Sequence, residues 1–160
     1  MGIIVSTFRG CGRSFFTELY RNKVKVFDKH RTLGNDELDE IMNVLDDYDI
    51  VFVDSSSKTR EMLEDRNIDY DVFYPSKDRR GEFIENEVRK RSNPKEIQEL
   101  DRYFDEWVDD IDDDDSENCH KHKLDAFGHF IGNNAVLMQY VTYVTNNNEE
   151  KQTHKKNDEG

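Results

Sequence analysis

One short segment near the start of the chain constrains the fold more than any other. The apolar run Ile3–Val5 leads into a turn that carries two glycines. After that turn, Phe15, Phe16 and Leu19 recur at helical spacing. A buried strand that passes through a glycine turn directly into a helix is the local unit of an α/β protein. We therefore expect an α/β fold with this strand near the centre of a parallel sheet.

The turn follows the spacing of a phosphate-binding loop, G-x-x-x-x-G-K-[ST]. Thr7 stands in the place of the first glycine and Arg13 in the place of the lysine. In such a loop, backbone N–H groups and the start of the next helix hold phosphate, and the Ser14 hydroxyl would bind Mg²⁺. The predicted phosphate-binding residues are Gly10, Cys11, Gly12, Arg13 and Ser14. The alternative is a tight strand-to-helix turn without a ligand.

Further apolar runs alternate with segments of helical period, which predicts a parallel sheet covered on both faces. The runs lie at residues 3–5, 24–27, 50–53 and 70–74. The first and third are the most continuously apolar, so we expect them to be central and adjacent. Residues 120–124 are a candidate edge strand.

A charged helix is predicted from about Asp78 to Lys90. Its arginines, with one just beyond it, are Arg79, Arg80, Arg89 and Arg91. Phosphoryl transfer develops negative charge that cations on a mobile lid would stabilise, so residues 76–92 are a candidate lid. Glutamates are interleaved with these arginines, and a salt-bridged surface helix is the alternative.

A second helix begins at Asn93-Pro94, a capping residue followed by proline at the first helical position. Its apolar face, which includes Trp107, is expected to pack into the core. The acidic run 112–115 is predicted to be a solvated connector, and residues 135–144 an apolar terminal element. We expect one domain over residues 1–145 and a disordered polar tail over 146–160.

Several polar residues are candidates for chemistry because of where they follow the strands. Asp54 ends an apolar run, and such an acid at the ligand edge of a parallel sheet can hold Mg²⁺. Asp28 follows the second run and can orient an acceptor hydroxyl, while Lys29 or Arg31 can meet a phosphate.

A metal site is a separate possibility near the predicted edge strand. Its candidate ligands are Cys119, His120 and His122, because thiolate and imidazole suit zinc. No fourth ligand is evident, and an exposed strand with incidental histidines is the simpler interpretation.

Several of these segments together resemble a family of small P-loop proteins of phages, large DNA viruses and bacteria, described as nucleoside or nucleotide kinase-like. The likeness covers most of residues 1–130 and lies in Thr7–Ser14, the turn at Asp28, residues 50–53, Tyr74–Lys77 and the helix ending at Trp107. The resemblance implies a three-layer P-loop NTPase fold with a five-stranded, mostly parallel sheet. It also implies ATP and Mg²⁺ at the loop and an arginine-bearing helical lid.

Composition limits the partners. The net charge of −13 opposes binding to polymeric nucleic acid and to anionic lipid. The two cysteines suggest no disulfide framework, and no apolar run is long enough to span a membrane, so we expect a cytoplasmic protein whose partner is a small nucleotide.

The leading functional hypothesis is an ATP-dependent phosphotransferase acting on a nucleoside or a nucleoside monophosphate. The candidate catalytic residues are Arg13, Asp28, Arg79, Arg80 and Arg89. The substitutions at Thr7 and Arg13 favour the alternative, a catalytically impaired module of the same fold that binds a nucleotide or a partner protein.

Overall fold

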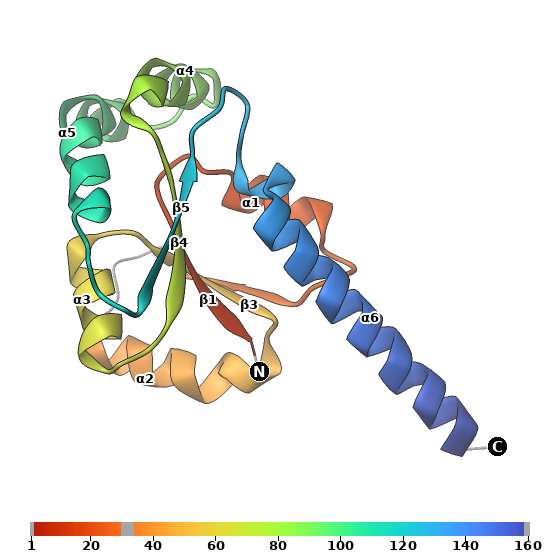
Figure 1. The fold of residues 1–160 in the computed structure, drawn as a ribbon. Coiled ribbons are helices and arrows are strands. Elements are labelled where there is room, and N and C mark those ends of the chain that lie inside the picture. Colours follow the sequence, from red (N-terminus) through yellow and green to blue (C-terminus); the bar gives the residue numbers. More distant parts are fainter. Residues whose placement is uncertain (1, 30–33, 159–160) are drawn as a thin grey trace.

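The computed structural model describes residues 2–29 and 34–158, with side chains described through residue 149. Five parallel strands form one sheet in the order β2-β3-β1-β4-β5, with helices on both faces (Figure 1). The strands are β1 (Ile3–Thr7), β2 (Val26–Asp28), β3 (Ile50–Asp54), β4 (Tyr70–Pro75) and β5 (Cys119–Leu124). The predicted α/β class and parallel sheet are confirmed.

The helices divide between the two faces of the sheet as the strand order requires. They are α1 (Arg13–Leu19), α2 (Asn35–Val44), α3 (Ser57–Asp65), α4 (Arg80–Arg89), α5 (Pro94–Asp112) and α6 (Ala135–Asp158). Short 3₁₀ turns are η1 (Leu45–Asp47), η2 (Lys77–Arg79) and η3 (Ile131–Asn133). The step from β1 to β2 runs opposite to the later crossovers, so right-handed connections put α1 on one face and α2, α3 and α5 on the other. In Figure 1, α6 lies on the α1 side and α4 crosses the carboxyl edge of the sheet.

The position of β1 determines where a ligand can bind. β1 is central and pairs with β3 on one side and β4 on the other, which confirms the predicted adjacency of the first and third runs. Its last residue, Thr7, is in register with Asp54 at the end of β3. After β1 the chain forms β2 and β3 on one side of β1 and then crosses to form β4 on the other side. The direction in which strands are added therefore reverses at β1. In open parallel sheets, ligands bind at this switch point, outside the carboxyl ends.

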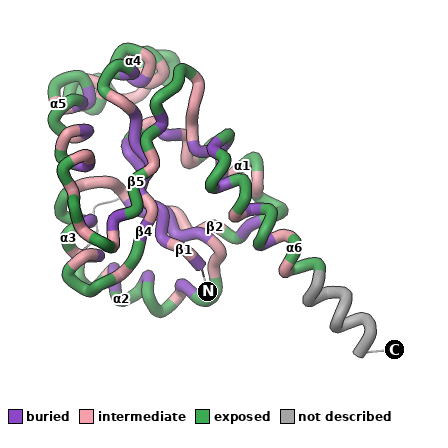
Figure 2. The backbone as a smooth tube through the Cα atoms, in the orientation of Figure 1, coloured by how far each residue is buried: buried purple, intermediate pink, exposed green. Residues whose placement is uncertain are grey.

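The core contains buried residues from the sheet and from helices on both of its faces. The central strands are buried throughout most of their length, as the purple segments of Figure 2 show. Helix α5 adds Leu100, Phe104, Val108 and Ile111, all buried. Trp107 packs against this core as predicted, next to Phe8 with ring centres 6.1 Å apart, although it is only half-buried.

Both ends of α5 are anchored by side chains. The Asn93 side chain accepts a hydrogen bond from the Lys95 N–H at 2.9 Å, and Pro94 is the first helical residue, as the sequence predicted. The acidic run at the other end is only partly the solvated connector that was predicted, because Asp113 and Asp115 are exposed but Asp112 and Asp114 have partners. Asp112 accepts a hydrogen bond from the Tyr74 hydroxyl at 2.6 Å, and the Asp114 side chain is buried against Arg60. These acids tie the end of α5 to β4 and α3.

Helix α6 also differs from the sequence-based expectation. Leu137, Val141 and Val144 are buried in the core, but the helix continues to Asp158, where the sequence predicted disorder from residue 146. Extending a helix adds one hydrogen bond per residue, whereas starting one fixes three residues for a single bond, so the packed turns favour continuation. Within the described residues, no helix combines the length and the apolar character that a membrane span requires.

Candidate functional site

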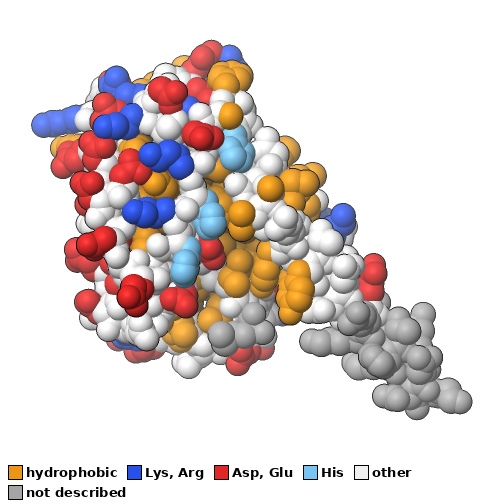
Figure 3. All heavy atoms as spheres, viewed as in Figure 1, with side chains coloured by type: hydrophobic (Ala, Val, Ile, Leu, Met, Phe, Trp, Pro, Cys, Tyr) orange, Lys and Arg blue, Asp and Glu red, His pale blue; other side chains and the backbone are white. Residues whose placement is uncertain are grey.

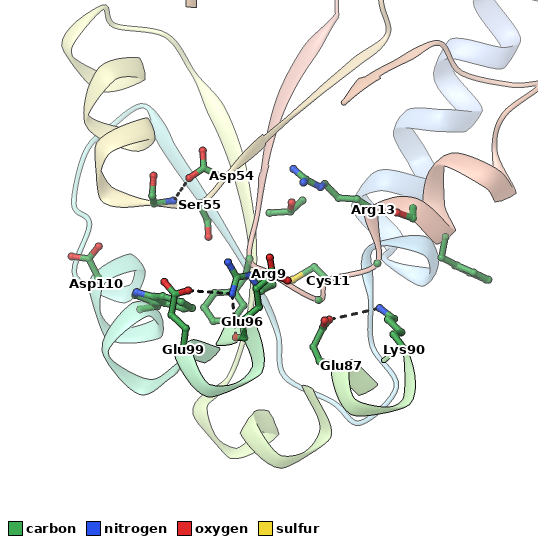
Figure 4. A pocket seen from close by; sticks show the side chains of 18 of the residues that line it. Arg9, Cys11, Arg13, Asp54, Ser55, Glu87, Lys90, Glu96, Glu99 and Asp110 are labelled. Atoms are coloured by element: carbon green, nitrogen blue, oxygen red, sulfur yellow. Dashed lines mark hydrogen bonds and ion pairs between the residues drawn. The ribbon is translucent and has the colours of Figure 1, made fainter. Parts of the chain in front are cut away.

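A cleft of about 810 Å³ lies at the carboxyl ends of β1 and β3 (Figure 4). Residues 7–15 after β1 and residues 54–57 after β3 line one part of it. The α4 and α5 side chains that line the rest are Glu87, Glu96, Glu99, Trp107 and Asp110, with Lys90 directly after α4. The cleft therefore contains the whole predicted phosphate-binding loop and Asp54.

The shape of the glycine loop is fixed by its backbone conformation and by hydrogen bonds to neighbouring elements. Gly10 and Gly12 have φ angles of 89° and 95°, a left-handed conformation in which glycine is favoured. Cys11 between them is buried, and its thiol donates to the Phe73 carbonyl on β4 at 3.5 Å. The Cys11 carbonyl accepts a hydrogen bond from the Ile131 N–H at 3.1 Å. The loop is thus tied to the sheet and to η3.

Cys11 is not suited to nucleophilic chemistry. Burial raises the pKa of its thiol to about 12, so the thiol stays protonated at neutral pH. Its place in the site is structural, because the side chain fixes the loop and leaves the backbone on the cleft side.

Helix α1 begins at this loop without a side-chain cap. Gly12 occupies the N-cap position and offers no side-chain acceptor. The first N–H groups of a helix have no partner within the helix. Ser14 also lines the cleft, so its hydroxyl lies beside this uncapped end.

Two residues predicted from distant parts of the sequence meet beside the loop. A guanidinium nitrogen of Arg13 lies 3.5 Å from an Asp28 carboxylate oxygen at the end of β2, and both side chains are about one-fifth exposed (19% and 20%). The Arg13 atom in this pair is the buried Nη1, which makes this ion contact but no hydrogen bond within the part of the chain that the structure describes. Lys29, by contrast, pairs with Glu37 at 3.3 Å, and Arg31 lies outside the described residues.

Asp54 is placed in the cleft and also holds the start of α3. Its carboxylate accepts hydrogen bonds from the Ser56 N–H at 3.1 Å and from the Thr59 hydroxyl. A carboxylate has about four acceptor positions, so these two bonds leave capacity for a cation. Figure 4 shows Asp54 and the Glu87–Lys90 pair on opposite sides of the loop.

The wall formed by α5 combines an aromatic ring with charge. Arg9 donates to the Glu96 carbonyl at 3.3 Å, lies 3.9 Å from Glu99, and stands over the Trp107 ring at 5.8 Å. Lys90 lies 3.9 Å from Glu87. Five acidic side chains line the cleft against three basic ones, so its lining is negative at neutral pH. An anionic ligand would fit this lining best when it carries a bound cation.

Arg79, predicted as a lid arginine, lies in the core instead. It is 4% exposed, donates to both carboxylate oxygens of Glu82 at 2.7 and 2.9 Å, and donates to two backbone carbonyls. Its guanidinium also lies 5.0 Å from the ring centres of Phe83 and Phe130. Together these contacts join η2 and the start of α4 to the end of β5 and the segment that follows it.

The remaining predicted lid arginines lie on the surface. Arg80 pairs with Asp101 on α5, and Arg89 pairs with Glu85 at 2.6 Å. Arg80, Arg89 and the exposed Arg91 do not line the cleft, and the cation that this segment does supply to it is Lys90. The arrangement is the salt-bridged helix that the sequence left as the alternative to an arginine lid.

The Arg79–Glu82 pair gives a prediction on pH. The hydrogen bonds from Arg79 hold the pKa of Glu82 below its usual value, so this pair stabilises the fold above pH 4.5 and its contribution is lost as the pH falls through the folded-state pKa. Glu82→Gln should cost about 1.5–3 kcal/mol at pH 7, and the difference from the natural chain should shrink in acid. Urea unfolding at a series of pH values measures it. Glu85→Gln, on the exposed pair, is the control and should change little.

Arg60 was not identified from the sequence, although it joins two walls of the cleft. It is 4% exposed, and its guanidinium pairs with Asp110 and Asp114 on and just after α5. Its Nε donates to the Ser55 carbonyl, in the loop after β3, at 3.1 Å. No local pattern marks such a residue, because its acidic partners lie far along the chain.

The predicted Cys–His metal set is not assembled within the described residues. Strand alternation puts Cys119 on the opposite face of β5 from His120 and His122. His122 lies 2.8 Å from Asp71 and stacks on Phe73, with ring centres 4.6 Å apart.

Cys119 lies near Glu64 and Asp114, with one ligand atom of each within 4.8 Å of the others. Those two acids are already bonded, because Glu64 accepts from the Tyr70 hydroxyl at 2.6 Å and Asp114 pairs with Arg60. The cluster is therefore part of the core that joins α3, α5 and β5.

Comparison with models of known protein families found no match to this chain, and a search among curated proteins found none either. What the chain does must therefore be inferred from the cleft. Its defining features are the glycine loop, the Arg13–Asp28 pair, Asp54 and the wall with Trp107.

Proposed function

We propose that the chain binds ATP with Mg²⁺ in this cleft and transfers the γ-phosphoryl group to a small acceptor, a nucleoside or a nucleoside monophosphate. One observation carries the proposal. The loop with positive φ angles at Gly10 and Gly12 follows the central strand β1, whose last residue is in register with Asp54. The loop therefore lies at the switch point of a parallel sheet. This placement supports a three-layer P-loop NTPase fold of the kinase-like kind that the sequence suggested.

The residues of the cleft fit the proposed ligand. The loop N–H groups and Arg13 would hold phosphate oxygens, and the Ser14 hydroxyl and Asp54 carboxylate would hold Mg²⁺. Mg²⁺, when bound, neutralises charge on the phosphates. Two features favour this assignment: the loop residue Arg13, whose guanidinium contacts Asp28 through an ion pair and not a hydrogen bond, and the excess of acidic side chains, which suits a nucleotide bound as its metal complex.

Asp28 is the proposed group that orients the acceptor and takes its hydroxyl proton. Its carboxylate lies beside the Arg13 guanidinium. Arg13 would contact a phosphate of ATP, and Asp28, which lies next to it, would contact the acceptor. The two predicted residues would therefore serve the two substrates side by side.

This arrangement predicts opposite effects of one substitution on binding and on transfer. Asp28→Asn should tighten ATP binding by several-fold, because it removes the charge that competes with phosphate for Arg13. It should lower kcat by about 10²–10⁴-fold, the usual contribution of a general base. Calorimetry and a turnover assay measure the two effects. Asp36→Asn, on the first turn of α2, is a control that should change neither.

A second candidate function is a nucleotide-binding module without catalysis. The observation that favours it is that three arginines of the 79–91 segment are engaged elsewhere, Arg79 in the core and Arg80 and Arg89 with surface acids. Such a module would bind ATP in the same cleft but would lack cations positioned for the transition state.

Acceptor-dependent formation of ADP separates the two functions. The chain should be incubated with ATP and Mg²⁺ and with a panel of nucleosides and nucleoside monophosphates, with Ser14→Ala as the impaired control. ADP formation that depends on one acceptor and falls in Ser14→Ala supports the phosphotransferase. Binding of ATP with no acceptor-dependent ADP from any member of the panel would assign the non-catalytic module.

A further inference from the structure

Asp54, the proposed Mg²⁺ ligand, is held by the segment that follows it in the chain. Its two carboxylate oxygens accept hydrogen bonds from the Ser56 N–H at 3.1 Å and from the Thr59 hydroxyl. The Ser56 side chain also caps α3, because it accepts a hydrogen bond from the Thr59 N–H at 3.3 Å. The direction of the Asp54 carboxylate therefore depends on where this loop and the first turn of α3 lie.

Arg60, the next residue of α3, joins this loop to α5. Its Nε donates to the carbonyl of Ser55, the residue directly after Asp54, at 3.1 Å. The two terminal nitrogens of the same guanidinium pair with Asp110 and Asp114, which lie near the end of α5 and just after it. In Figure 4, Asp54, Ser55 and Asp110 lie on the same side of the glycine loop. One buried group therefore connects two walls of the cleft.

A guanidinium suits this junction better than an amine would. It is planar, stays charged and presents its N–H donors in fixed directions, so it can satisfy one carbonyl and two carboxylates together. The Arg60 and Asp114 side chains are both buried. Acidic side chains gather on the side of the molecule where α3 and α5 lie (Figure 3). Because like charges repel, a cation between the two helices helps to keep them in contact.

We propose that Arg60 is a positioning residue for the metal site, which holds residues 54–57 so that the Asp54 carboxylate stays available in the cleft to bind Mg²⁺. This inference rests on the proposed function, because it takes Asp54 to be a metal ligand. Arg60 would act through Asp54 and would not touch the ligand itself. Mg²⁺ demands near-ideal octahedral geometry, so a small displacement of one carboxylate weakens its binding. Groups that orient a metal ligand typically contribute 10–100-fold to metal affinity.

The Mg²⁺ dependence of ATP binding tests this role. Calorimetry at a series of Mg²⁺ concentrations should show that Arg60→Met raises the concentration needed for the half-maximal gain in ATP affinity by about 10–100-fold. Arg60→Lys keeps the charge but not the fork, so a smaller shift in the same direction is expected. ATP affinity without Mg²⁺ should change little in either variant, since the glycine loop is anchored separately to β4 and η3.

Arg79→Met is the matched control for a general loss of stability. Arg79 is also buried and paired with an acid, but its contacts join η2 and α4 to the end of β5 rather than to the loop after β3. This variant should leave the Mg²⁺ dependence unchanged. Urea unfolding shows whether each variant folds, and if Arg60→Met does not fold, the result for Arg60→Lys decides.

The outcomes separate this inference from the proposed function. A natural chain whose ATP affinity does not rise with Mg²⁺ would overturn both. If the natural chain responds to Mg²⁺ and the Arg60 variants respond at the same concentration, the positioning role is overturned and the proposed function stands. An equal shift in Arg79→Met would also overturn the positioning role, because a general loss of stability would then account for the effect.

Discussion

Arg79→Met should lower the free energy of unfolding by about 3–5 kcal/mol, the range for removing one partner of a buried ion pair. Arg79 is 4% exposed and satisfies Glu82 as well as the Leu124 and His129 carbonyls. Methionine fills a similar volume but leaves the Glu82 carboxylate and both carbonyls without that donor. Urea unfolding at pH 7 measures the loss.

Arg80→Met is the matched control for this substitution. Arg80 is the next residue in the chain and pairs with Asp101 at the surface, with side chains 44% and 56% exposed. Exposed pairs contribute about 0–1 kcal/mol. If Arg79→Met left stability unchanged but lowered kcat, Arg79 would return to the catalytic site and its role in the core would be refuted.

Arg13→Ala should weaken ATP binding by about 1.5–3 kcal/mol, which corresponds to roughly 10- to 150-fold in the dissociation constant. The reason is that Arg13 stands in the lysine position of the loop and has a buried nitrogen that makes no hydrogen bond in the described structure. Calorimetry with ATP and Mg²⁺ measures the change. Arg21→Ala is the control, because Arg21 follows the same helix but pairs with Glu18 in solvent.

Arg13→Lys tests whether the arginine limits catalysis. If the forked side chain is only a poor substitute for lysine, turnover should rise while ATP affinity changes little. Unchanged ATP affinity in Arg13→Ala would instead remove Arg13 from the phosphate site and leave its ion pair with Asp28 as a structural contact.

The fold could be predicted from the sequence because strands and helices have different apolar periods. The continuous runs at residues 3–5 and 50–53 mark central strands, and they are neighbours in the sheet. Asn93-Pro94 gives the start of α5 because capping and proline geometry are local. Neither property depends on residues far away.

Only those residues of the site that directly follow the ends of strands could be predicted from the sequence. Asp54 and the glycine loop meet in the cleft because parallel strands end at one edge. The positions of Arg79 and Trp107 depend on how α4 and α5 are rotated over the sheet, which charge and apolar spacing do not determine. The Arg13–Asp28 pair was not anticipated, although both residues were candidates, because side-chain pairing across two strands leaves no trace in either segment.

Equilibrium binding of ATP, with and without Mg²⁺, tests the central claim most directly. Calorimetry on the natural chain should show one ATP per chain, with affinity that rises when Mg²⁺ is present and falls in Ser14→Ala. Slower amide exchange in residues 9–15 with ATP bound would locate the ligand at the loop. Failure to bind ATP at millimolar concentration with Mg²⁺ present, or binding that Ser14→Ala and Arg13→Ala both leave unchanged, would contradict the assignment of this cleft as a nucleotide site.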